Sequence, residues 1–190
     1  DSSIVQFDFS RPYQLDLATV QTAFQSSQEP AKSATPVNLI PLQAAVSLYR
    51  GDFLEGFSLA DAPEFDDWAS LQREVWHQRL ERVFNRLSRL QFEAGQVDEA
   101  LDTTRQWLAH DSLHEAAYRR LMQLHFLAGN RTAALQTYEQ CRRILAEELG
   151  AEPEAETTVL AERIRKDEGG KLKDEKASFP STIHHLPSAF

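Results

Sequence analysis

Hydrophobic residues recur every three or four positions through most of the chain, which is the period of a helix packed on one side. The longest stripe begins after Pro63 and ends at Gly95, and it predicts one helix of about 30 residues, or about 45 Å. The apolar residues of this stripe are Trp68, Leu71, Val75, Leu80, Val83, Phe84, Leu87 and Leu90. Because a helix in water gains most of its stability from packing, we expect this segment to form the spine of the domain.

A second pattern repeats at an offset of 34 residues. Gly95 and Gly129 each follow an alanine and separate two helical stretches, so each predicts a turn that lets two helices fold back antiparallel. The other matched pairs are Phe84 with Tyr118, Leu87 with Leu121, Leu90 with Leu124, Ala100 with Ala134, and Leu101 with Leu135. A helix–turn–helix period of this length with these residue types is the tetratricopeptide signature. Since one such hairpin cannot bury its apolar faces alone, the hairpins are expected to stack.

Capping patterns predict where several helices begin. Three pairs have the residue order that favours a helix start: Thr35 with Pro36, Asp61 with Glu64, and Ser112 with Glu115. The first of these helices is expected to end at Gly51. A further helix is predicted to begin at Asp16, and a last one after Pro153 is expected to cover the open end of the stack.

The two ends of the chain differ from its helical middle. Alternating apolar and polar residues predict a short β-hairpin over residues 1–17. Residues 166–190 are rich in charge, glycine and proline, and this composition is typical of a flexible linker. The predicted fold is therefore all-α, with tetratricopeptide-like stacked hairpins over residues 18–165 and a short N-terminal β-hairpin.

Composition limits the function classes. With 42% hydrophobic and 26% charged residues the chain can form a sizeable core, so wholesale disorder is excluded. A net charge of −9 argues against a general nucleic-acid-binding surface, which would need a basic footprint. No apolar run reaches the length of a membrane span and no signal-peptide pattern opens the chain, so a cytoplasmic protein without membrane contact is expected.

Candidate catalytic and metal-binding motifs are few. The chain contains no glycine-rich phosphate loop and no nucleophile elbow, so neither an enzyme nor a cofactor is predicted. His110 and His114 have the spacing of a two-histidine zinc helix, but a helix starting between them would separate their side chains, and no metal site is predicted there. The single cysteine, Cys141, is expected to be a buried small hydrophobe. The three tryptophans, Trp68, Trp76 and Trp107, are expected in the core.

One polar arrangement has two interpretations, a solvated helix face and a groove that binds a partner. Positions that face the concave side of a tetratricopeptide stack carry arginine and amide side chains, with an aromatic residue one turn further on in each repeat. The predicted groove consists of Arg82, Asn85, Arg89, Phe92, Arg119, Gln123 and Phe126. Arginine suits the binding of an acidic peptide, a partner's helix or a neighbouring domain, because its planar fork pairs with carboxylates and stacks on aromatics.

Several motifs resemble the bacterial transcriptional activator domain, which occurs in the streptomycete antibiotic regulatory proteins and in related large ATP-binding regulators. The resemblance rests on residues 48–54, 68–82, 118–122 and 133–139. Its most specific motif is Leu145-Ala146-Glu147-Glu148-Leu149-Gly150-Ala151-Glu152-Pro153. It covers roughly residues 13 to 165.

This resemblance implies a function in transcription regulation. In the family the domain follows a winged-helix DNA-binding domain, so residues 1–17 are expected to be its junction or remnant, and DNA contact is expected only through that absent domain. The expected partners are another protein, a neighbouring domain of the same regulator, or a second copy in a homodimer. The alternative is a free-standing tetratricopeptide adaptor that binds a peptide in its concave groove.

Overall fold

The described part of the chain folds into helices. The computed structural model describes residues 10, 15–28, 38–59 and 61–166, and within these ranges it contains helices and no strand, which confirms the all-α prediction. The helices are α1 (Asp16–Gln28), α2 (Ile40–Leu48), α3 (Pro63–Glu93), α4 (Val97–His110), α5 (Glu115–Leu127), α6 (Arg131–Leu149) and α7 (Ala155–Lys166). None of these helices is long and apolar enough to cross a bilayer.

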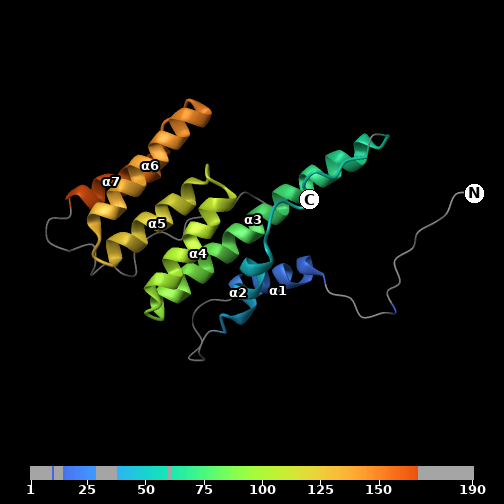
Figure 1. Cartoon of the computed structure of the whole chain (residues 1–190), viewed down its shortest axis with the longest axis horizontal. Coiled ribbons are helices and arrows are strands. Elements are labelled where there is room, and N and C mark those ends of the chain that lie inside the picture. Colours follow the sequence, from blue (N-terminus) through green and yellow to red (C-terminus); the bar gives the residue numbers. More distant parts are fainter. Residues whose placement is uncertain (1–9, 11–14, 29–37, 60, 167–190) are drawn as a thin grey trace, which may run out of the picture.

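Consecutive helices pack against one another along the molecule (Figure 1). The long helix α3 pairs with α4, α5 pairs with α6, and α4 and α5 join the two pairs. On the other side of α3 lie α1 and α2, which also contact each other, while α7 packs against α5 and α6. The predicted spine is confirmed, because α3 extends over 31 residues and contacts helices from both halves of the chain.

The two glycine turns have the same geometry. Gly95 and Gly129 adopt φ values of +79° and +88°, a left-handed conformation that residues with a Cβ rarely adopt. The amide of Gln96 donates to the Gln91 carbonyl at 2.8 Å, and the amide of Asn130 donates to the His125 carbonyl at the same distance. These bonds satisfy carbonyls at each helix end and reverse the chain direction. Both turns predicted from the 34-residue offset are therefore confirmed.

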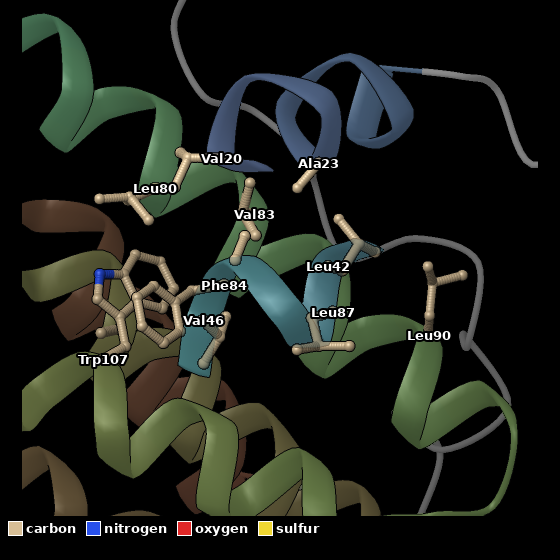
Figure 2. Close-up of a cluster of buried hydrophobic side chains, with 12 residues drawn as sticks. Val20, Ala23, Leu42, Val46, Leu80, Val83, Phe84, Leu87, Leu90 and Trp107 are labelled. Atoms are coloured by element: carbon tan, nitrogen blue, oxygen red, sulfur yellow. The ribbon is translucent and has the colours of Figure 1, made fainter. Parts of the chain in front are cut away.

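The largest apolar cluster joins four segments around α3 (Figure 2). Val83, Phe84 and Leu87 of α3 are fully or almost fully buried, and α1 and α2 cover them with Val20, Ala23, Leu42, Ala45 and Val46. From the opposite side, the indole of Trp107 on α4 stacks on the Phe84 ring, with 6.0 Å between centroids and 9° between planes. Burial of this apolar surface fixes α1 and α2 on the first hairpin.

A smaller cluster holds the last helix. Leu160, Ala161 and Ile164 of α7 pack against buried side chains of α5 and α6, among them Met122 and Tyr138. The predicted last helix after Pro153 is confirmed, and it buries an apolar face that the α5–α6 pair would otherwise expose.

Two of the predicted helix starts are wrong because other groups organise those turns. At α3 the N-cap is Ala62, without a side-chain bond, and Pro63 begins the helix through its fixed φ, so Asp61 does not cap. At α5 the N-cap is His114, not Ser112. Glu115 cannot complete a capping box there, because its carboxylate accepts hydrogen bonds from the backbone amide of Glu154 and the hydroxyl of Thr157.

The second helix is shorter than predicted at both ends. It begins at Ile40, whose amide donates to the Asn38 side chain at 3.1 Å, and the predicted cap Thr35 lies outside the described residues. It ends at Leu48 because Tyr49 adopts an extended conformation, so Gly51 does not stop it. Most of the predicted β-hairpin over 1–17 and almost all of the predicted linker over 166–190 lie outside the described residues. Asp16 and Leu17, assigned to that hairpin, belong to α1.

The first half of α3 extends past the helices that pack on its second half, toward the upper right of Figure 1. The three residues that we name the α3 strip, Trp68, Leu71 and Val75, have exposed fractions of 46%, 67% and 37%. Their predicted place in the core is therefore wrong, because no helix of the described chain covers this part of the stripe. Trp107 is buried as predicted, and Trp76 is half-buried.

Candidate partner-binding site

The loop between α2 and α3 packs against one side of the α3 strip. The guanidinium of Arg73 donates from Nε to the Phe53 carbonyl at 2.9 Å and from Nη2 to the Leu54 carbonyl at 3.0 Å. The rings of Phe53 and Phe65 lie edge-on and tilted against Trp68, with centroid distances of 5.9 and 5.6 Å. These contacts hold the indole in place while nearly half of it stays exposed. The strip is thus a fixed apolar surface, the kind that partners use because little side-chain entropy is lost on binding.

The predicted arginine groove does not lie open along its whole length. At one end, the Arg82 guanidinium lies 5.6 Å from the Phe24 ring of α1, a cation–π contact. At the other end, Arg119 donates to Glu154 at 2.8 Å and to the Thr157 hydroxyl at 2.9 Å, which ties α5 to the segment that begins α7. Both arginines therefore hold neighbouring elements of the same chain.

The remaining predicted groove residues separate into two kinds. Asn85, Arg89 and Gln123 are partly exposed, and Arg89 forms an ion pair with Glu93 at 3.2 Å. Phe126 is buried in the cluster beneath α7, and Phe92 packs against the apolar contacts between α4 and α5. Phe126 therefore belongs to the core, whereas Phe92 is only partly buried.

Two arginines that the sequence analysis did not select lie close to Arg89. Arg120 of α5 donates from Nε to the Ser88 hydroxyl at 3.1 Å, while its buried Nη2 meets no acceptor within the described ranges. Burial, with a smaller contribution from the nearby Arg89, lowers the pKa of Arg120 to about 10. The pKa of Arg86 is lowered for the same two reasons, in the same order. We name Arg86, Arg89 and Arg120 the arginine cluster.

The repeat contains the signal that could have identified this cluster. Arg86 and Arg120 are 34 residues apart, so they occupy equivalent positions in the two hairpins. The Glu93 carboxylate raises the pKa of Arg86 and the pKa of Arg120, against the larger effect of burial. Guanidinium groups gathered in this way suit a carboxylate-bearing ligand, because their planar forks pair with carboxylates.

The single cysteine lies in the core of the domain. Cys141 is fully buried, as predicted, and burial raises the pKa of its thiol to about 12. Since the thiolate is the nucleophile, this residue is an apolar part of the core beside Tyr118 and Leu145.

Comparison with known families decides the identity of the helical region. The family described as the bacterial transcriptional activator domain matches residues 15–165. This chain belongs to that family. The matched segment of the activator domain begins one residue before α1 and ends one residue before the end of α7, so every described helix lies within it or reaches its edge.

One relative is itself a regulator. Over 116 residues the activator domain is 35% identical to the regulatory protein AfsR of Streptomyces griseus, an alignment that covers 60% of this chain and 12% of AfsR. The chain therefore spans a small part of that relative. No solved structure matches the activator domain.

Proposed function

We propose that this activator domain is a non-catalytic protein-interaction and regulatory module of a bacterial transcriptional activator. Such a module would mediate self-association, control between domains or contact with the transcription machinery. DNA would be bound by a winged-helix domain outside this chain. The observation that carries the proposal is the α3 strip, because exposing Trp68, Leu71 and Val75 together on one helix face is unfavourable unless another surface covers them. The stack is proposed to be of the tetratricopeptide kind, which the 34-residue spacing of Gly95 and Gly129 supports.

A second copy of the chain is the occupant of the strip that we favour. Glu64 and Asp67 are exposed at the start of α3, and Arg79 and Arg82 follow about four turns later on the same helix. If two α3 helices paired antiparallel through their strips, the acidic end of each would lie beside the basic stretch of the other. Such an arrangement is self-complementary, as a two-fold symmetric dimer requires.

Replacing Leu71 by glutamate should abolish self-association. The residue is the most exposed of the strip, so the new charge is tolerated in the monomer but would be desolvated in the dimer interface. Sedimentation velocity over a concentration series would compare Leu71→Glu with the unaltered chain. Val159→Glu on α7 is the matched control, since Val159 is also an exposed aliphatic residue, and it should leave the dimer intact. A chain that stays monomeric throughout, or equal effects of the two substitutions, would contradict the dimer.

A free-standing adaptor that binds an acidic peptide is the second candidate function. The arginine cluster favours it, because the buried Nη2 of Arg120 lacks an acceptor in the isolated domain and would gain from a carboxylate ligand. The adaptor would bind such a peptide without the remainder of a regulator.

Replacing Arg120 by methionine should weaken the binding of an acidic peptide without lowering the stability of the domain. The long apolar side chain keeps most of the packing and removes the desolvated charge, so the melting temperature is expected to stay unchanged or to rise. Binding of a fluorescent glutamate-rich peptide, followed by anisotropy at low salt, should fall at least tenfold. Arg105→Met, which removes an exposed arginine paired with Asp102, should change neither quantity. Equal peptide binding by the two variants would argue against the adaptor.

A further inference from the structure

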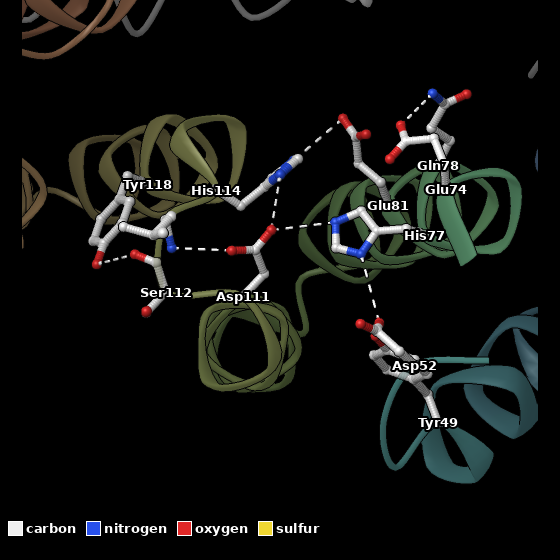
Figure 3. Close-up of polar contacts among 11 residues, drawn as sticks. Tyr49, Asp52, Glu74, His77, Gln78, Glu81, Asp111, Ser112, His114 and Tyr118 are labelled. Carbon is white, nitrogen blue, oxygen red and sulfur yellow. Dashed lines mark hydrogen bonds and ion pairs between the residues drawn. The ribbon is translucent and has the colours of Figure 1, made fainter. Parts of the chain in front are cut away.

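Two histidines and an aspartate from three separate segments meet beside the first hairpin (Figure 3). His77 lies on α3, Asp111 is the C-cap of α4, and His114 is the N-cap of α5. Oδ2 of Asp111 lies 3.2 Å from Nε2 of His77 and 3.5 Å from Nδ1 of His114. One nitrogen from each imidazole and one carboxylate oxygen all lie within 4.8 Å of one another.

These separations resemble those of atoms that share one metal ion. Ligand atoms about 2.0–2.1 Å from a tetrahedral zinc ion are about 3.3 Å apart, close to both contacts of Asp111 Oδ2. One nitrogen of each imidazole also lies within 4.8 Å of the other, so the three ligand atoms are close enough to surround one ion.

The outer nitrogen of each imidazole faces another carboxylate. Nδ1 of His77 lies 4.0 Å from Asp52, and Nε2 of His114 lies 3.4 Å from Glu81. Metal-bound histidines commonly have such a carboxylate behind them, because it fixes the tautomer and the ring orientation and increases the basicity of the ligating nitrogen. In Figure 3 the His114 ring lies above the Asp111 carboxylate and the His77 ring to its right, with Glu81 joined to His114 and Asp52 to His77.

A hydrogen bond from the backbone fixes the orientation of the Asp111 side chain. Oδ1 of Asp111 accepts a hydrogen bond from the Leu113 amide at 3.0 Å, which leaves Oδ2 directed toward the two histidines. His114 is held from the side by the Trp107 ring, 4.9 Å away between centroids. The side chains of His77, Asp111 and His114 are mostly buried but remain partly exposed, so an ion and a water ligand could reach them.

The geometry points to a binding site for a divalent transition-metal ion, zinc in the first place, formed by His77 Nε2, Asp111 Oδ2 and His114 Nδ1. Two imidazoles and one carboxylate favour such an ion over magnesium or calcium, which prefer oxygen ligands. The ion would link α3 to the connection between α4 and α5 and so fix the first hairpin against the second. His110 has no part in it, because its ring packs against Tyr49, 4.5 Å between centroids.

The test uses zinc ions with the whole chain. The background protein carries His184→Gln and His185→Gln, so that the histidine pair near the C-terminus supplies no ligands. After removal of metal with a chelator, isothermal titration with zinc should give one equivalent per chain and a higher melting temperature, and magnesium should give neither. His77→Gln, His114→Gln and Asp111→Asn should each weaken zinc binding at least tenfold. His110→Gln is the matched control and should bind zinc as the background does.

Asp111→Asn is the most informative variant. The asparagine oxygen can still accept from the Leu113 amide, so the turn should keep its structure while the anionic ligand is lost. Circular dichroism and melting without metal would verify that each variant folds. A background protein that binds no zinc would overturn the inference. Zinc binding that survives both Asp111→Asn and His77→Gln, or that His110→Gln abolishes equally, would also overturn it.

Discussion

Replacing Trp107 by alanine is expected to lower the free energy of unfolding by about 3–5 kcal/mol. The indole is 3% exposed and lies between the Phe84 ring and the His114 ring, in the cluster that also receives α1 and α2. Removal of a buried aromatic residue loses its transfer free energy and leaves a cavity that neighbours fill only partly. Urea unfolding followed by circular dichroism would measure the change.

Trp68→Ala is the matched control for this prediction. Trp68 contacts Phe53 and Phe65 on one side and is exposed on the other, so its loss should cost only about 1 kcal/mol. The two substitutions remove the same side chain, and only their burial differs. Similar losses of stability in the two variants would contradict the packing described around α4.

Periodicity predicted the helical elements well because it records burial on one face. The 34-residue offset placed both glycine turns, and the apolar stripe placed α3 nearly to the residue. The same stripe could not distinguish Leu87, which α1 and α2 help to bury, from Leu71, which no described helix covers. A hydrophobic pattern states that a face is suited to burial, but the neighbour that covers it depends on the fold.

Helix starts were predicted less well, since several side chains compete for the same backbone groups. Ser112 and Glu115 have the order of a capping box, yet Asp111 organises the turn by accepting from Leu113. Glu115 bonds instead to the segment that begins α7, far away in the sequence. A local motif predicts a cap only when no tertiary partner offers its residues a better bond.

Contacts between distant segments also explain what the sequence analysis missed in the candidate sites. The helical face of Arg82 and Arg119 was predictable from spacing, whereas their engagement by α1 and by the start of α7 was not. His77 and His114 are 37 residues apart with no motif between them, and only the packing of α3 beside the α4–α5 connection unites them with Asp111. By contrast, the 34-residue repeat alone could have predicted that Arg86 and Arg120 occupy equivalent positions.

Replacing Arg119 by glutamate is expected to detach α7 and to lower the stability of the second half of the domain by about 2–3 kcal/mol. The arginine side chain is 20% exposed and pairs with Glu154 and, at 3.7 Å, with Glu156. A glutamate at position 119 would face both of them and Glu115, and it would leave the buried Thr157 hydroxyl without its donor. Because Glu154 and Glu156 are more than half exposed, solvent screening keeps the loss of stability below that of a fully buried pair.

Cys141 supplies the measurement for this last prediction, because its buried thiol can react with a thiol reagent only when the surrounding helices open. Glu115, Arg119 and Glu154 lie close enough to influence its pKa, so detachment of α7 should increase its reaction rate at least tenfold. Arg165→Glu makes the same charge reversal on α7 itself, where Arg165 forms an exposed pair with Glu139, and should cost less than about 1 kcal/mol. If both variants left the thiol equally protected, Arg119 would have no special part in holding α7, and apolar burial alone would account for its docking.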